Sequence, residues 1–136
     1  MTNKASHIDD AAIKLLVDHF YEIVIKDEVI GPVFHKAIGD DITQWQSHLL
    51  TMYRFWSSVM LTSGRYKGNP VAVHKSLEGI KVEMFTHWLD LWDGACDDIF
   101  EAPQALAFKT RARRIAGSLM ATIFSDGPDE LKAYPA

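Results

Sequence analysis

Apolar side chains recur every three or four residues along most of this 136-residue chain, which is the spacing of one face of an α-helix. Similar stripes run through residues 13–24, 82–99 and 105–123, with Trp88 at the edge of its stripe. The clearest stripe lies in residues 43–60, where one arc of about 120° on a helix holds Trp45, His48, Leu49, Met52, Phe55, Trp56 and Val59. No run of alternating β-branched residues predicts a strand. The pattern therefore predicts an all-α fold.

Glycine, proline and capping residues mark the ends of the predicted helices. Ser6 with Asp9 resembles a capping box, so we expect the first helix to begin there and to end at Gly31. Pro32 then opens a short turn that carries Phe34.

A second capping box, Thr43 with Gln46, is expected to start the helix over residues 43–60. After a glycine-rich loop, TSGRYKGNP, Asn69 is a good N-cap residue, with Pro70 at the first helical position and Gly79 as a C-terminal cap. A helix of about nine residues is too short to be stable alone, so its tertiary setting must hold it in place.

Length and composition fit one domain, residues 1–136, with a single bulky core, because hydrophobic residues make up 48% of the chain and aromatic residues 11%. The net charge of −4 argues against nucleic acid or an anionic membrane as the main partner. The lone Cys96 excludes an internal disulfide, reads as a small buried side chain and suits a reducing compartment. The N-terminus has no apolar signal core, and no apolar run approaches roughly 18 residues. We therefore expect a soluble, cytoplasmic monomer.

Most enzyme signatures are absent from the sequence, including GxSxG, the P-loop, GxGxxG, HExxH and CxxC. No two of the six histidines lie at i, i+4 with a carboxylate beside them, which is the spacing that would indicate a zinc or di-iron site. Helix capping explains the acidic pairs better than catalysis does; these pairs are Asp9–Asp10, Asp40–Asp41 and Asp97–Asp98. The solvated face of a helix is the simplest account of the basic cluster Lys109, Arg111, Arg113 and Arg114.

Two histidines stand apart from this pattern. His48 lies on the apolar face of a predicted helix, and His74 follows 26 residues later in the short capped segment. A buried imidazole needs a partner, because an unpaired buried polar group costs roughly 1–3 kcal/mol. A backbone carbonyl could satisfy His48, and His74 taken alone could be a surface residue. An aromatic-rich helical core with isolated imidazoles also suits a large, flat, apolar cofactor held by one axial histidine, namely haem.

Four blocks of sequence give this alternative more weight. Together they resemble the truncated haemoglobins, with order and spacing intact from about residue 10 to residue 120. The blocks are HFYEIVIKDEVIGPVFHKAIG, WQSHLLTMYRFW, YKGNPVAVH and FTHWLDLW. The glycine pairs that mark loops in the other truncated groups are missing, so the chain is most similar to the third group. The resemblance implies a compact, globin-like 2-on-2 helical sandwich around haem b (iron protoporphyrin IX).

The resemblance also implies a role for each matched residue. His74 matches the proximal histidine that binds the iron, and its other ring nitrogen should donate to a backbone carbonyl. Tyr21 matches the distal tyrosine, Trp88 the distal tryptophan and His48 the distal gate histidine. For Tyr21 and Trp88, an ordinary boundary or core role is the alternative.

Further matches concern the walls of the haem pocket. Met52 would cover the distal face of the haem, and Phe34 would pack against the porphyrin. Arg65, Tyr66 and Lys67, just ahead of the proximal helix, could reach the haem propionates.

A haem iron with one open position implies binding of O₂, CO and NO. Two donors, Tyr21 and Trp88, would hold O₂ tightly, which suits NO detoxification or peroxidase-like chemistry better than bulk O₂ transport. Turnover would need electrons from an unidentified reductase. The alternatives are a haem-based gas sensor or ligand-binding module without turnover, and a helical interaction protein without a cofactor.

Overall fold

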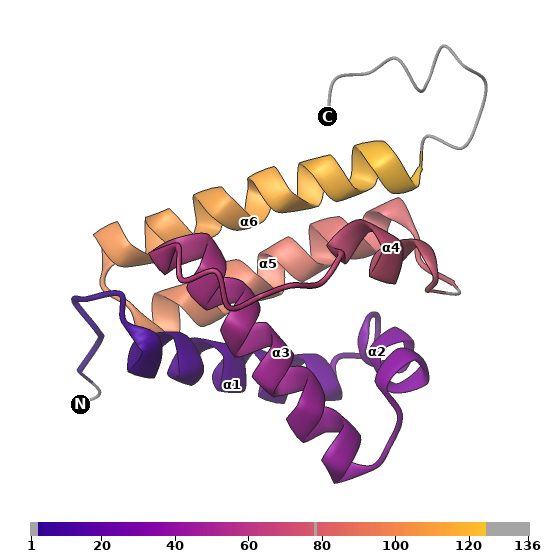
Figure 1. Cartoon of the computed structure of the whole chain (residues 1–136), viewed down its shortest axis with the longest axis horizontal. Coiled ribbons are helices and arrows are strands. Elements are labelled where there is room, and N and C mark those ends of the chain that lie inside the picture. Colours follow the sequence, from indigo (N-terminus) through magenta and orange to yellow (C-terminus); the bar gives the residue numbers. More distant parts are fainter. Residues whose placement is uncertain (1–2, 78, 125–136) are drawn as a thin grey trace.

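The computed structural model describes residues 3–77 and 79–124, and within them it is entirely helical (Figure 1). The prediction of an all-α fold is confirmed. The six helices are α1 (Asp10–Lys26), α2 (Gly31–Ile38), α3 (Ile42–Leu61), α4 (Pro70–Lys75), α5 (Val82–Ile99) and α6 (Ala102–Ile123).

The four long helices enclose the core. Helices α5 and α6 run antiparallel as a pair, α1 packs against α5, and α3 crosses α1 (Figure 1). The short α2 lies near the ends of α1 and α3, whereas α4 packs beside α6. The N–H of Ala5 donates to the carbonyl of Ile99, and the N–H of Glu101 donates to the carbonyl of Ala5, which ties the N-terminal segment to the junction between α5 and α6.

A column of three indoles lies at the centre of this core. Trp92 of α5 is 1% exposed and stacks between Trp56 of α3 and Trp88 of α5, with ring centroids 4.5 and 5.6 Å away. Phe20 of α1 meets both Trp88 and Trp92 edge-on. Aromatic pairs of this kind contribute about 0.5–1.5 kcal/mol beyond their burial, so the column fixes α1, α3 and α5 relative to one another.

The first helix is shorter than the sequence pattern predicts. Asp9, not Ser6, is the N-cap, since its carboxylate accepts the N–H of Ala12 at 2.9 Å. The helix ends at Lys26 rather than at Gly31, because the side chain of Asp27 accepts two backbone N–H groups and starts a turn. Gly31 is instead the first residue of α2, so the predicted turn around Phe34 is a helix.

Two further helix ends differ from expectation. The N-cap of α3 is Asp41, whose N–H donates to Gln44, so the predicted capping box at Thr43 and Gln46 is wrong. Asn69 does cap α4 as predicted, accepting the N–H of Ala72 at 3.1 Å with Pro70 in the first turn. That helix ends at Lys75, so it is only six residues long and stops before Gly79.

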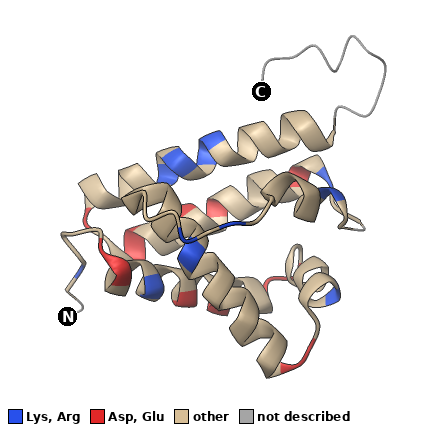
Figure 2. Cartoon of the chain, viewed as in Figure 1, with Lys and Arg blue, Asp and Glu red and all other residues tan. Residues whose placement is uncertain are grey.

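Acidic and basic residues are distributed along the helices and loops (Figure 2). Asp97 binds Lys109 at 2.7 Å and Asp98 binds His19 at 2.8 Å, so this acidic pair joins helices rather than capping one. Arg113 pairs with Asp93, which shows that part of the basic cluster bridges α6 to α5. None of the helices in the described part of the chain is long and apolar enough to span a membrane.

Cys96 is buried as expected. It has no exposed surface, and burial raises the pKa of its thiol well above the usual value. The thiol is therefore protonated and inert in the folded protein.

Candidate cofactor site

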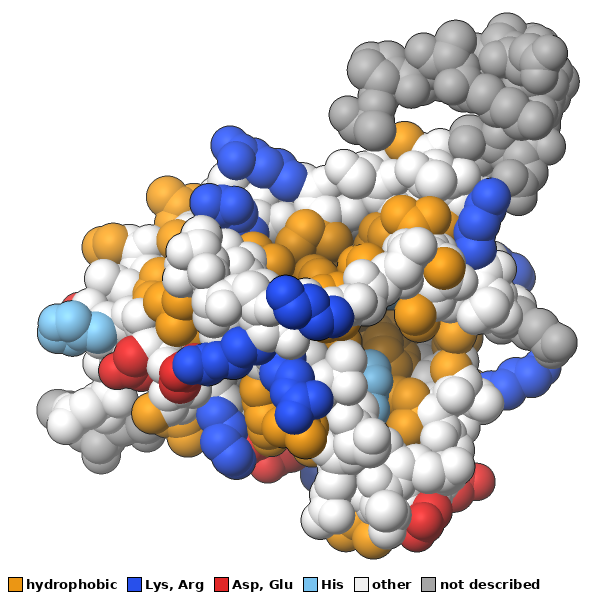
Figure 3. All heavy atoms as spheres, viewed as in Figure 1, with side chains coloured by type: hydrophobic (Ala, Val, Ile, Leu, Met, Phe, Trp, Pro, Cys, Tyr) orange, Lys and Arg blue, Asp and Glu red, His pale blue; other side chains and the backbone are white. Residues whose placement is uncertain are grey.

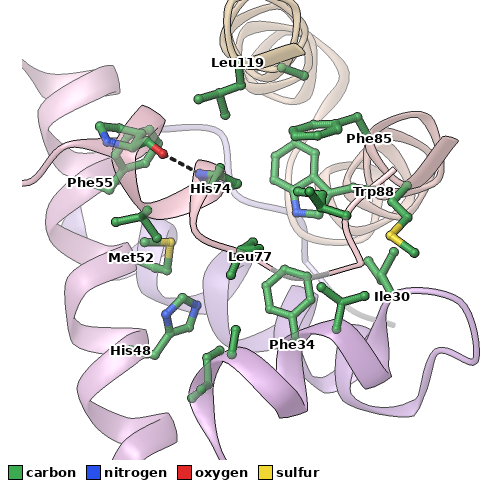
Figure 4. A pocket seen from close by; sticks show the side chains of 18 of the residues that line it. Ile30, Phe34, His48, Met52, Phe55, His74, Leu77, Phe85, Trp88 and Leu119 are labelled. Atoms are coloured by element: carbon green, nitrogen blue, oxygen red, sulfur yellow. Dashed lines mark hydrogen bonds between the residues drawn. The ribbon is translucent and has the colours of Figure 1, made fainter. Parts of the chain in front are cut away.

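A cavity of about 600 Å³ opens between α2, α3, α4, α5 and the inner face of α6. Figure 3 shows a hollow lined by hydrophobic side chains in which a histidine is visible, and Figure 4 shows the interior. The walls are mainly apolar, and they include Ile30, Phe34, Met52, Phe55, Phe85 and Leu119. A cavity of this size and character is typical of a site for a bulky apolar ligand.

His74 enters the cavity from the short helix α4. Its Nδ1 lies 2.7 Å from the carbonyl oxygen of Pro70, one turn earlier (Figure 4). Because a carbonyl can only accept, Nδ1 carries the proton and donates it, which leaves the lone pair of Nε2 free for a ligand. The expected hydrogen bond to a backbone carbonyl is confirmed, and the surface alternative for His74 is excluded by its place in the cavity wall.

His48 reaches the cavity from α3 (Figure 4). Its Nε2 is buried and has no hydrogen-bond partner in the described part of the chain. Burial, and to a smaller extent the nearby His74, lowers the pKa of His48 to about 4. The imidazole is therefore neutral at physiological pH. Since no carbonyl satisfies Nε2, the unpaired atom points to a ligand in the cavity.

Tyr21 closes the same part of the cavity from α1. It is 6% exposed, and its ring meets His48 at 5.0 Å and Phe34 at 5.8 Å between centroids. Burial raises the pKa of Tyr21 far above its usual value. The hydroxyl is therefore a permanent donor, available to a molecule in the cavity.

Trp88 forms another part of the wall. Its ring lies parallel to that of Trp92, at an interplanar angle of 6°, and faces the pocket (Figure 4). The indole column fixes the ring from behind, so a donated hydrogen bond from Trp88 would have a defined direction.

Phe34 and Met52 also line the cavity as predicted. The three residues expected to reach the propionates, Arg65, Tyr66 and Lys67, do not all lie at the cavity. Tyr66 lines the cavity, whereas Lys67 is exposed and Arg65 directs its guanidinium to α1 and α3. The structure thus brings Tyr21, Trp88, His48 and His74 around one space and leaves Arg65 and Lys67 outside it. A propionate contact for any of the three remains a prediction.

Several wall residues escaped the sequence analysis. They come from segments far apart in the chain, and they include Leu77, Ile80, Phe85 and Leu119. Phe85 and Leu119 belong to stripes that predict helices, but periodicity indicates a buried face without saying whether another side chain or a cofactor covers it.

These residues fit a haem. The described residues contain no group of three or more His, Cys, Asp or Glu side chains that could hold a metal ion by themselves. They do offer one imidazole with a free Nε2, an apolar slot, and a second imidazole with an unpaired buried nitrogen. A flat, apolar group that carries its own iron would occupy the slot and take one ligand from the chain.

Comparison with known proteins leads to the same family. No family model matches the chain. The group 3 truncated hemoglobin ctb of Campylobacter jejuni is 30% identical over 124 residues, which cover 91% of this chain and 98% of that protein. The crystal structure of a group III truncated hemoglobin from Campylobacter jejuni superposes with a TM-score of 0.87 at 29% identity, covering 93% of this chain and 99% of that one. The chain therefore belongs to the truncated haemoglobin family, and within it to group III.

Proposed function

We propose that this chain binds haem b through His74 and holds a diatomic gas on the side of the cavity that carries Tyr21, Trp88 and His48. One observation carries the proposal. The Nδ1 of His74 is committed to Pro70, so its Nε2 is the free nitrogen in an apolar cavity of suitable size. A haem bound there would supply an iron with one open coordination position, at which O₂, CO or NO binds.

The distal residues would then act as hydrogen-bond donors. The hydroxyl of Tyr21 is protonated at all ordinary pH values because burial raises its pKa, and the indole N–H of Trp88 is a donor only. His48 is neutral because its pKa is lowered to about 4, so it adds no positive charge to the cavity. Donors aimed at a polarised ligand slow its release.

Slow release suits a redox role better than bulk O₂ transport. We infer that the protein supports NO detoxification or peroxidase-like chemistry and receives electrons from a separate reductase. For this role we propose a cytoplasmic location, which the single cysteine favours, and a monomeric state, which the net charge of −4 favours.

The absorption spectrum of the purified protein tests the proposal. We expect a Soret band that shifts on reduction with dithionite and shifts again when CO is added. If the chain shows no Soret band even after addition of hemin, haem binding is wrong. The rates of NO and peroxide consumption then separate the two redox activities, and a haem protein with neither would be a gas sensor or ligand-binding module.

A further inference from the structure

The helix that carries His74, α4, has only six residues and contains no buried residue. Val71 packs against side chains of α5 and α6, but a helix this short has little stability by itself. The position of His74 therefore depends on the segment that leads into α4, residues 62–69.

Two serines of α3 hold that segment. The hydroxyl of Ser57 donates to Ser63 at 2.8 Å, and the hydroxyl of Ser58 accepts the backbone N–H of Tyr66 at 2.8 Å. Ser57 is a polar residue that is only 1% exposed, so its hydroxyl lies inside the protein. Neighbouring hydroxyls on one helix thus fix both ends of the stretch from Ser63 to Tyr66.

Arg65 extends these contacts to α1. Its Nη1 donates to the carboxylate of Asp10 at 2.9 Å and to the hydroxyl of Ser57 at 3.2 Å. One guanidinium therefore joins the first turn of α1, the buried serine of α3 and the segment that precedes α4. Its neighbour Tyr66 turns the other way and lines the cavity.

We propose that Arg65 is a positioning residue for His74, which it places by clamping residues 62–69 onto Asp10 and Ser57. The inference rests on the proposed haem ligation by His74. It differs from a contact with the haem propionates, because the guanidinium is already engaged on the outer surface and lies outside the cavity wall.

The size of the expected effect follows from exposure. The side chains of Arg65 and Asp10 are 55% and 57% exposed, and exposed ion pairs contribute little to global stability. The hydrogen bond to the buried Ser57 is shielded and charge-assisted, so it carries more of the constraint. Losing the clamp should therefore loosen α4 without unfolding the protein.

The variant Asp10→Asn tests this directly, because Asp10 is remote from the cavity wall and cannot touch a cofactor there. Each of the two single variants, Asp10→Asn and Arg65→Ala, should speed haem transfer to apomyoglobin about two- to tenfold. Each should also shift or broaden the iron–histidine stretching band in the resonance Raman spectrum of the reduced protein. The control is Lys14→Gln, which removes a different surface ion pair of α1, Lys14–Asp18, at 2.7 Å.

The outcomes separate the alternatives. If Arg65→Ala speeds haem loss and Asp10→Asn behaves like the control, Arg65 acts on the cofactor itself and the clamp is wrong. If the two variants lower the unfolding free energy of the haem-free chain by as much as the faster haem loss corresponds to in free energy, the role is merely structural and the proposal is overturned. If no protein in the set takes up haem, it is the proposed function that fails, because the clamp changes only the rate of haem loss.

Discussion

The carboxylate of Asp27 lies 2.8 Å from Nε2 of His87 and also accepts the backbone N–H groups of Val29 and Ile30, each at 2.9 Å. One side chain thus connects the end of α1, the start of α2 and the middle of α5. Ile30 lines the cavity, and His87 directly precedes Trp88, which also lines it. The Asp27–His87 pair therefore ties three cavity-forming helices together.

Loss of this charge should destabilise the fold. Burial alone would raise the pKa of Asp27, but hydrogen bonds from Ile30, His87 and Val29 outweigh it and hold the pKa below its usual value. We expect Asp27→Asn to lower the free energy of unfolding by about 1–3 kcal/mol at neutral pH, measured by urea denaturation.

The pH dependence of the same variant gives a second check. A carboxyl with a depressed pKa in the folded state stabilises the protein above its unfolded pKa, and this stability is lost as pH falls through the folded pKa. The difference between wild type and Asp27→Asn should therefore shrink below about pH 4. The control is Glu28→Gln, which changes the exposed neighbouring residue. An equal loss of unfolding free energy in Asp27→Asn and Glu28→Gln would argue against the Asp27–His87 pair.

Tyr21→Phe removes the hydroxyl and keeps the ring and its packing. A hydrogen bond to a polarised ligand contributes roughly 1.5–3 kcal/mol, so O₂ should leave about 10 to 150 times faster in stopped-flow experiments. Tyr53→Phe, which removes a hydroxyl bonded to Asp18 between α1 and α3, is the matched control. An unchanged rate in Tyr21→Phe would remove Tyr21 from the distal site.

His48 should make the protein less stable in acid. Its folded pKa is about 4, below the unfolded value, so the unfolded chain binds a proton that the folded chain does not. The stability that this contributes is complete above the unfolded pKa near 6.5 and is lost as pH falls towards 4, at up to about 1.4 kcal/mol per pH unit.

The variant His48→Leu should therefore show a shallower decline of unfolding free energy between pH 6.5 and pH 4. It should also be at least as stable as wild type at neutral pH, since an unpaired buried nitrogen costs roughly 1–3 kcal/mol. His7→Gln, at an exposed site, controls for removal of a histidine. Parallel curves for wild type and His48→Leu would contradict the burial argument.

His74→Gly should abolish tight haem binding, because α4 then offers no imidazole to the iron. Free imidazole added to the variant should restore the Soret band in part, since the cavity walls remain intact. His35→Gly, outside the cavity, is the control and should keep its haem. Normal haem retention by His74→Gly would show that another residue is the ligand.

The sequence predicted most of the helices, because these depend on local signals. The resemblance to a known family singled out Tyr21, His48, His74 and Trp88, and the structure places all four around one cavity, while their roles remain predictions. A stripe of period 3.6 marks the buried face of a helix, and Asn69 with Pro70 marks the start of α4. The helix ends were less predictable. Asp9, Asp27 and Asp41 compete with nearby serine, glycine and threonine residues for the same capping roles, and only the folded backbone decides between them.

Arg65 shows why the rest of the site needed the structure. In the sequence, Arg65, Tyr66 and Lys67 form one basic-aromatic run with a single expected role. In the fold, Tyr66 faces the cavity while Arg65 reaches Asp10, a residue 55 positions earlier. No periodic pattern encodes a contact of that separation, so direction and partner come only from tertiary packing.

The acceptor for Nδ1 of His74 is a main-chain carbonyl within its own helix, so this hydrogen bond does not depend on the side chain of any other residue. A side-chain acceptor could be lost by a single substitution, whereas a carbonyl is present whatever residue occupies the position. A substitution at position 70 that keeps the helical turn would therefore leave the same tautomer of His74 in the cavity wall. The helical turn itself sets the tautomer.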